Sequence, residues 1–248
     1  MIRFILTLIF VVVFLILSIP MFLIEWIIGK ISPEAKSRSS LAIVNWAFGV
    51  VIFIAGTKVI AIGEDNVPKD TPVLYVANHR SFYDIILTYV RVPRLTGYVA
   101  KKEILKVPLL RQWMKNLHCL FLDRDNVKEG IKTILAAVEK ERNGISMCIF
   151  PEGTRNKKPD CFLPFHDGSF KIASKADVPV VPVTLLNTAA IFEDHLPKIK
   201  KATVVIHYGE PVYIKNLDKD TQKNVGDYFQ KLISDTYFED KENFKDKF

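Results

Sequence analysis

The apolar run at the N-terminus restricts the fold more than any other feature of the sequence. The stretch FILTLIFVVVFLILSIPMFLI, from Phe4 to Ile24, carries no charged residue over 21 positions. At about 1.5 Å per helical residue, it is long enough to cross a hydrocarbon core about 30 Å thick. Nearly every face of such a helix is apolar, whereas a helix on a soluble core keeps a polar face. We therefore predict a membrane helix here.

A cleaved signal peptide is the competing interpretation of this run. The end of the run, SIPMFLIEW from Ser18 to Trp26, offers no small-x-small cleavage site. The run is also longer than the apolar core of a usual signal peptide. We therefore expect the segment to be retained.

A second uncharged stretch, from Ser39 to Thr57, is interrupted by asparagine and glycine, so it is compatible with spanning, re-entering or lying in the membrane interface. Arg3 precedes the first segment, and three basic residues follow it: Lys30, Lys36 and Arg38. The positive-inside rule then places the loop between the segments in the cytoplasm. The rest of the chain stays there only if the second segment does not cross, so we predict a partly inserted or interfacial second helix. Two full crossings with both ends inside are the alternative.

Beyond the apolar segments, short β-rich runs alternate with amphipathic ones. Six runs are predicted strands: residues 58–63, 71–78, 96–102, 145–153, 178–186 and 202–209. A helix is predicted within residues 125–144, with an acidic or amide cap at its start, Gly144 after its end, and one apolar face made of Val127, Ile131, Ile134, Leu135 and Val138. This alternation predicts an α/β fold, a mostly parallel or mixed sheet covered by helices and preceded by the N-terminal membrane helices.

The expected organisation is therefore two parts. Residues 1–57 form membrane-binding helices, and residues 58–248 form one catalytic domain on the cytoplasmic side of the cell membrane. The charged tail from Asp235 to Phe248 is expected to be a solvated, frayed end.

The net charge and the cysteine spacing indicate which classes of partner and metal site to expect. The net charge of +7 suits anionic partners such as nucleic acid, an acidic lipid leaflet or phosphorylated substrates. The apolar segments favour the membrane, and we expect no nucleic-acid partner. Cys119, Cys148 and Cys161 show no CxxC spacing, so buried thiols are expected rather than disulfides or a zinc site, and no metal is expected.

Two predicted strands end in dense polar sequence. NHRSFYD, from Asn78 to Asp84, follows one strand, and PEGTR, from Pro151 to Arg155, follows another. In open α/β sheets, ligands gather outside the carboxyl ends of strands. We therefore expect both turns to lie at one site.

The first turn pairs a histidine with an aspartate. If His79 lies just before a helix and Asp84 lies in its first turn, the carboxylate is aimed back at the imidazole. It would fix the tautomer and leave the other ring nitrogen free to take a proton from a substrate hydroxyl. Ser81 is expected to cap the helix rather than act as a nucleophile. The alternative is a helix-capping Asn-His pair with an incidental surface aspartate.

The second turn, FPEGTR, fits a phosphorylated substrate. Proline and glycine shape a tight turn that exposes backbone amides. Arg155 adds a planar fork whose geometry matches phosphate.

Four blocks in order carry a resemblance to a known family. They are NHRSFYD, the region from KKEILKVPLLRQWM to FLDR (Lys101 to Arg124), FPEGTR and VPVVPV (Val178 to Val183). At these residues the chain resembles the glycerophospholipid acyltransferase family, in particular the bacterial 1-acylglycerol-3-phosphate acyltransferases, over about residues 58 to 215. His118 departs from the small residue that relatives often carry there, and without a nearby carboxylate it is expected to be a surface or hydrogen-bonded histidine.

The resemblance implies a role for each of these positions. His79 would be the general base, oriented by Asp84. The glycerol phosphate would be handled by Arg124, Glu152, Gly153, Thr154 and Arg155. The supporting residues would be Asn78, Arg80, Ser81 and Lys101.

The resemblance also implies the reaction. The chain would transfer an acyl group from acyl-CoA or acyl carrier protein to lysophosphatidic acid, forming phosphatidic acid, with a hydrophobic pocket for the acyl chain and no cofactor. Two alternatives stay open: acylation of glycerol 3-phosphate or another lysophospholipid, and an inactive membrane protein that binds anionic lipids.

Overall fold

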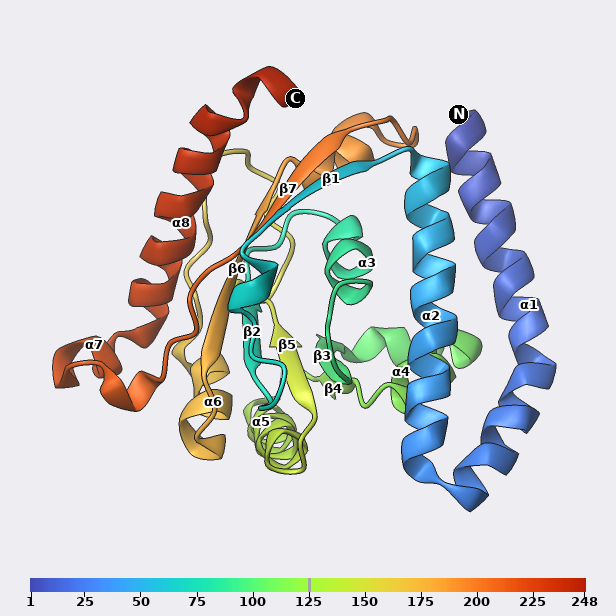
Figure 1. The fold of residues 1–248 in the computed structure, drawn as a ribbon, viewed down its shortest axis with the longest axis horizontal. Coiled ribbons are helices and arrows are strands. Elements are labelled where there is room, and N and C mark those ends of the chain that lie inside the picture. Colours follow the sequence, from blue (N-terminus) through green and yellow to red (C-terminus); the bar gives the residue numbers. More distant parts are fainter. Residues whose placement is uncertain (125) are drawn as a thin grey trace.

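A seven-stranded mixed sheet forms the centre of the protein (Figure 1). The structure, a computed structural model, describes residues 1–124 and 126–248. The strand order is β1-β7-β6-β2-β5-β3-β4. The strands are β1 (Lys58–Ile62), β2 (Leu74–Ala77), β3 (Thr96–Lys101), β4 (Leu120–Leu122), β5 (Ser146–Ile149), β6 (Val180–Leu186) and β7 (Thr203–Tyr208). All six predicted strands are therefore confirmed, and β4 precedes Arg124.

Five neighbouring strands run parallel to one another: β6, β2, β5, β3 and β4. Strand β7 is antiparallel to β6, and β1 is parallel to β7. This arrangement confirms the predicted parallel or mixed sheet. It also places the carboxyl ends of β2, β5 and β6 at the same edge.

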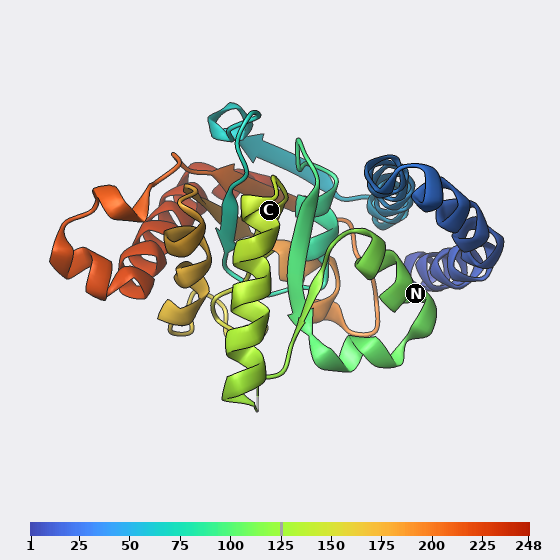
Figure 2. The same ribbon diagram turned by 90° about the horizontal axis from the view of Figure 1, so that it is seen from below.

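Helices cover both faces of the sheet (Figures 1 and 2). They are α1 (Ile2–Ile31), α2 (Pro33–Ala55), α3 (Tyr83–Tyr89), α4 (Pro108–Asn116), α5 (Val127–Arg142), α6 (Lys171–Ala176), α7 (Lys219–Lys223) and α8 (Val225–Asn243). Strand β2 shows why both faces are covered. Its Tyr75 and Ala77 point into the core beneath α2 and α3, while Leu74 and Val76 point into the core beneath α6 and α8. A strand buried on both faces is apolar throughout rather than alternating.

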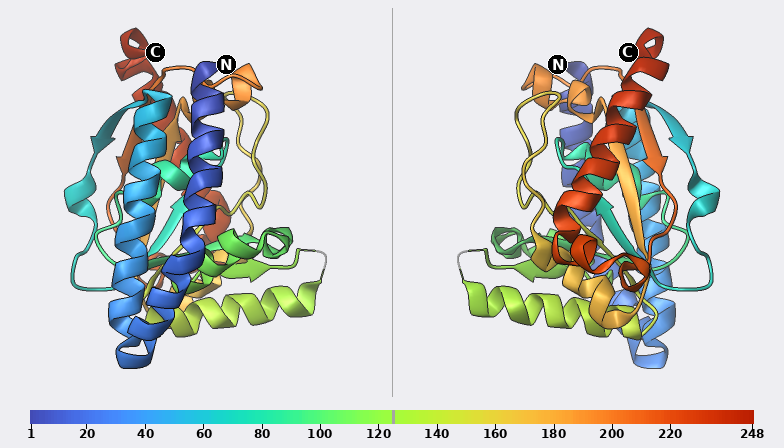
Figure 3. Two further views of the ribbon diagram at one scale, coloured as in Figure 1. Left: turned by 90° about the vertical axis from the view of Figure 1, so that its right-hand side faces the viewer. Right: turned by 90° about the vertical axis from the view of Figure 1, so that its left-hand side faces the viewer.

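The two N-terminal apolar segments form an antiparallel helical hairpin (Figure 3). Ser32 joins them, and its hydroxyl caps α2 by accepting a hydrogen bond from the Ala35 amide at 3.1 Å. Pro33 occupies the first turn of α2, where its missing N–H costs nothing. Both helices are long and apolar enough to cross a membrane. Both segments are therefore helical, and their predicted place in the membrane stays a prediction.

One side of the hairpin packs along the rest of the protein. Phe4, near the start of α1, stacks on Phe192 with ring centroids 5.8 Å apart. Further along α1, Trp113 of α4 contacts the ring of Phe22, and its indole N–H donates to the Ser18 hydroxyl at 2.7 Å. The other side of α1 exposes large apolar side chains along its whole length. A patch of this size on a protein surface marks a membrane or protein contact.

The charged tail departs from the prediction. Residues up to Asn243 belong to α8, and Ile233, Tyr237 and Asp240 are buried against the sheet. Their spacing of four and three residues places them on one helical face. The expectation of a frayed end from Asp235 onward is therefore wrong for most of this segment, because its charged residues occupy only the outer face of a helix.

Helix α5 is confirmed, but its predicted apolar face is only partly right. Asn126 caps its start by accepting hydrogen bonds from the amides of Lys128 and Glu129. Val138 is buried, and Ile134 packs against the core. The other three predicted core residues are exposed: Val127, Ile131 and Leu135. Strand β4, beside these three residues, is only three residues long and leaves the first turns of α5 uncovered. Asp125, at the start of the predicted helix, lies outside the described residues.

Candidate active site

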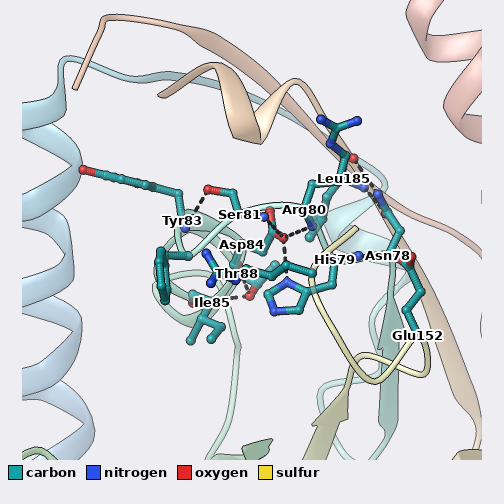
Figure 4. A network of polar contacts seen from close by, with 12 residues as sticks. Asn78, His79, Arg80, Ser81, Tyr83, Asp84, Ile85, Thr88, Glu152 and Leu185 are labelled. Atoms are coloured by element: carbon teal, nitrogen blue, oxygen red, sulfur yellow. Dashed lines mark hydrogen bonds and ion pairs between the residues drawn. The ribbon is translucent and has the colours of Figure 1, made fainter. Parts of the chain in front are cut away.

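His79 and Asp84 form a hydrogen-bonded pair at the carboxyl end of β2 (Figure 4). The chain turns after Ala77, and α3 begins at Tyr83, so Asp84 lies in the first helical turn. Asp84 Oδ2 lies 2.8 Å from His79 Nδ1. The carboxylate is fully buried, whereas 13% of the histidine side chain is exposed. The Asp84 carboxylate therefore reaches the His79 imidazole five positions earlier in the chain, as predicted.

The same carboxylate oxygen also holds the backbone of the turn. The amides of Arg80 and Ser81 donate to Asp84 Oδ2 at 2.7 and 2.8 Å. With Nδ1–H donated to this oxygen, the ring carries its lone pair on Nε2, and Nε2 has no hydrogen-bond partner among the described residues. A neutral imidazole in this state can accept a proton from a bound hydroxyl.

The turn after β5 holds His79 from three directions. The ring of Phe150 stacks on the imidazole, with centroids 4.1 Å apart and planes 20° apart. The His79 amide donates to Glu152 Oε1 at 2.8 Å, and the His79 carbonyl accepts from the Asn156 amide at 2.7 Å. The two predicted turns are therefore joined directly, as the adjacency of β2 and β5 requires.

Glu152 is engaged by backbone amides on both oxygens. Besides His79, the Leu163 amide donates to Oε2 at 3.1 Å, and the side chain is buried. Burial raises the pKa of Glu152 above its ordinary value, and the two amide hydrogen bonds only partly oppose this shift. These contacts suit a residue that shapes the turn, and the prediction that it handles substrate phosphate stays a prediction.

Gly153, Thr154 and Arg155 form the outer part of the turn. Gly153 has φ of 71°, a left-handed conformation that favours glycine, and Thr154 is exposed. The Arg155 guanidinium lies over the ring of Phe82, with Cζ 3.6 Å from the centroid. Its Nη1 lies 3.2 Å from Glu193 Oε1. Arg155 is therefore held beside the His79 turn, and its side chain is about one-third exposed.

Three of the predicted supporting residues stabilise the first turn. Asn78 exchanges two hydrogen bonds with the backbone of Leu185 in β6, at 2.9 and 2.8 Å. The Ser81 hydroxyl accepts from the Tyr83 amide at 3.0 Å, which confirms its expected place at the helix start. Arg80 donates to the Lys158 carbonyl at 2.8 Å. These contacts fix the position of the His79 backbone within the sheet.

Lys101 and Arg124 lie farther along the same edge. Lys101 is the last residue of β3, Arg124 follows β4, and β5 and β3 lie between β2 and β4. Lys101 pairs with Glu103 at 3.0 Å, and both Lys101 and Arg124 are exposed. The structure thus places them at the expected edge without bringing them into contact with the His79 turn.

His118 is hydrogen-bonded, as predicted. Its Nε2 lies 2.9 Å from the Ser37 hydroxyl of α2, and its Nδ1 lies 3.2 Å from Lys140 Nζ. Burial, together with the charges of Lys140 and Lys36, lowers the pKa of His118 to about 4. It is therefore a neutral link between the hairpin and α5.

Three residues at the site were not assigned from the sequence. Phe150 and Asn156 flank the PEGTR turn, so their nearness to that motif is a signal that could have found them. Glu193 lies 112 residues from Ser81 and belongs to no motif. Only the position of its segment after β6 places it here.

Comparison with known proteins gives a family match, similar sequences and a similar fold. Residues 58–186 match the acyltransferase family. A Saccharomyces cerevisiae protein described as 1-acyl-sn-glycerol-3-phosphate acyltransferase is 30% identical over 187 residues, which cover 75% of this chain and 60% of the yeast protein. A Borreliella burgdorferi protein with the same description is 27% identical over 76% of this chain and 75% of its own length.

A solved structure shares the fold. The crystal structure of the 1-acyl-sn-glycerophosphate (LPA) acyltransferase PlsC from Thermotoga maritima superposes with a TM-score of 0.77 over 96% of each chain, at 23% sequence identity. The sheet and the N-terminal hairpin described above therefore occur together in a solved structure.

Proposed function

Because this chain belongs to the acyltransferase family, we propose that it transfers an acyl group from a thioester to the free hydroxyl of 1-acylglycerol 3-phosphate, forming phosphatidic acid. The observation that carries the proposal is the His79–Asp84 pair, with Nε2 unpartnered among the described residues and Arg155 held beside the same turn. The names of the yeast and Borreliella relatives support the choice of acceptor.

In the proposed reaction, His79 Nε2 takes the proton of the acceptor hydroxyl while Asp84 stabilises the imidazolium that forms. The acceptor oxygen forms a bond to the thioester carbonyl carbon, giving a tetrahedral oxyanion. The C–S bond then breaks, and the thiolate leaves with the proton from the imidazolium. Coenzyme A or acyl carrier protein is thereby released as the thiol, and no group on the protein is acylated.

Arg155 is proposed to bind the acceptor phosphate. One edge of its guanidinium faces Glu193 and one face covers Phe82, which leaves the remaining N–H groups to donate to an anion. Gly153 and Thr154 would approach the phosphate through the exposed turn. Arg124, at the same sheet edge, would contact a more distant part of either substrate.

The hairpin is proposed to lie in one leaflet rather than to cross the bilayer. Residues 58–248 contact α1 from Phe4 to Phe22, which is most of the length of this helix. If α1 stood perpendicular to the membrane, this contact would carry the sheet into the hydrocarbon. If the exposed face of α1 enters the leaflet instead, the apolar side chains are buried and the sheet stays in water.

This placement keeps the predicted division of the chain. Residues 1–57 would attach the protein to the cell membrane, and residues 58–248 would carry out the chemistry on the cytoplasmic side, where thioester donors are found. The acceptor and the product would both remain in the leaflet that holds the hairpin.

The direct test is acyl transfer from labelled acyl-CoA to a panel of acceptors in vesicles. We expect transfer to 1-acylglycerol 3-phosphate to exceed transfer to glycerol 3-phosphate and to lysophosphatidylcholine. If the protein acylates either of the latter two faster, that compound replaces 1-acylglycerol 3-phosphate as the proposed acceptor. Vesicle binding with no transfer to any acceptor, from acyl-CoA or acyl carrier protein, would favour a lipid-binding protein without activity.

A further inference from the structure

Glu193 lies where three segments of the candidate active site meet. It begins a short 3-10 helix (Glu193–His195) that follows β6, and its side chain is 17% exposed. Its Oε2 accepts from the Ser81 hydroxyl at 2.6 Å, and its Oε1 accepts from the Phe82 amide at 2.7 Å. Arg155 Nη1 lies 3.2 Å from the same Oε1. One carboxylate thus connects segments that follow β2, β5 and β6.

Both contacts that orient Arg155 depend on this carboxylate. The first is the ion pair itself. The second is the ring of Phe82 beneath the guanidinium, and the Phe82 backbone is held by its amide hydrogen bond to Glu193. An arginine without these contacts would sample many rotamers, and binding a substrate would then have to order it.

The same carboxylate also links Arg155 to His79. Ser81 and Phe82 belong to the turn that is closed by the hydrogen bonds from the Arg80 and Ser81 amides to Asp84. Anchoring Arg155 to this turn therefore sets its distance from the His79 imidazole. An acceptor that offers a phosphate and a hydroxyl at the matching separation is selected by that distance.

We propose that Glu193 is a positioning residue that holds Arg155 in register with His79 and thereby creates the preference for a phosphorylated acceptor. This inference rests on the proposed function. Glu193 does not itself touch phosphate, because two anions would repel each other. Its effect passes through the direction of the Arg155 N–H groups.

The test is Glu193→Gln, which keeps the size of the side chain and an oxygen that can accept from the Phe82 amide but removes the ion pair. We expect the KM for 1-acylglycerol 3-phosphate to rise about tenfold, the loss that accompanies removal of one charge-assisted contact. The KM for acyl-CoA should stay near its wild-type value. Transfer to an uncharged monoacylglycerol should be unchanged, so the preference for the phosphorylated acceptor should fall by the same factor.

Two further variants separate positioning from a general loss of structure. Glu210→Gln makes the same chemical change at an exposed position after β7, at the opposite edge of the sheet, and should leave every constant unchanged. In an Arg155→Ala background, Glu193→Gln should add no further rise in the acceptor KM, because Glu193 acts through Arg155.

The outcomes are distinguishable. If the wild-type protein acylates no phosphorylated acceptor, the proposed function fails. If it does, and Glu193→Gln either keeps the wild-type acceptor KM or raises the KM values of both substrates equally, the positioning role is wrong. A further rise in the Arg155→Ala background would also overturn it.

Discussion

Asp84→Asn tests the central claim about the candidate active site, because it removes a charge while keeping the shape of the side chain. Asp84 Oδ2 accepts three N–H groups, and Oδ1 has no partner among the described residues. An asparagine oxygen at the Oδ2 position would still accept from the amides of Arg80 and Ser81. The turn should therefore stay folded, and the main loss is the negative charge beside His79.

The expected size of the effect follows from that charge. Two unit charges about 4 Å apart interact by about 4 kcal/mol at an effective dielectric constant of about 20. If the imidazolium forms only on the way to the transition state, this energy is lost from the barrier alone. At about 1.4 kcal/mol per tenfold change, kcat should fall about a thousandfold.

The assay is continuous thiol release with 1-acylglycerol 3-phosphate and acyl-CoA at saturation, with thermal melting to show that the variant is folded. His79→Ala should reduce transfer in the same assay to a small residual rate while the protein stays folded and membrane-bound. In that background, Asp84→Asn should lower the residual rate no further, because Asp84 acts through His79. A folded Asp84→Asn variant with kcat within tenfold of wild type would refute the reasoning, as would an additive loss in the double variant.

Three further predictions follow from other contacts. Arg155→Lys keeps the charge but loses the planar fork, so the KM for the phosphorylated acceptor should rise more than the KM for acyl-CoA, and equal effects on both would make Arg155 structural. Glu141 is buried with neither oxygen hydrogen-bonded among the described residues, and burial raises its pKa to about 8. The folded state then keeps a proton that the unfolded state loses above its ordinary pKa of 4.5, so stability should fall as pH rises from 4.5 to 8. Glu141→Gln should remove this slope and raise the free energy of unfolding at pH 7 by about 3 kcal/mol, measured by denaturant melts at several pH values, and an unchanged slope would contradict it. Leu17 and Leu23 are exposed on α1, so Leu17→Lys together with Leu23→Lys should release the protein from anionic vesicles in flotation assays without lowering its melting temperature. Retention of this variant on the vesicles would mean that the outer face of α1 does not enter the leaflet.

The N-terminal hairpin is packed against the rest of the protein by specific side-chain contacts. Trp113 of α4 packs between α1 residues Phe14 and Phe22, so α1 is part of the same folded core as the sheet. Glu25 of α1 accepts hydrogen bonds from Ser39 and Ser40 of α2 at 2.7 and 3.1 Å. These contacts join the two helices of the hairpin to each other and pack α1 against α4. In the proposed placement, these contacts set the orientation of the candidate active site relative to the leaflet that α1 enters.

The sequence by itself determined the parts of this protein that depend on neighbours along the chain. The apolar segments at the N-terminus, the six predicted strands and the helix after Asn126 all follow from local composition and periodicity. The pairing of His79 with Asp84 was also predictable, because both residues belong to one turn and the direction of helical side chains closes the gap between them.

Only the tertiary structure decided which distant segments meet. The order of the strands places the turns after β2 and β5 side by side and separates Arg124 from both, although all three follow strands of one sheet. It also brings Glu193 to Ser81 across 112 residues, and no local pattern encodes such a contact. The exposed first turns of α5 and the buried end of α8 have the same origin. An amphipathic pattern shows that a helix has an apolar face, but the extent of the neighbouring sheet determines how much of that face is covered.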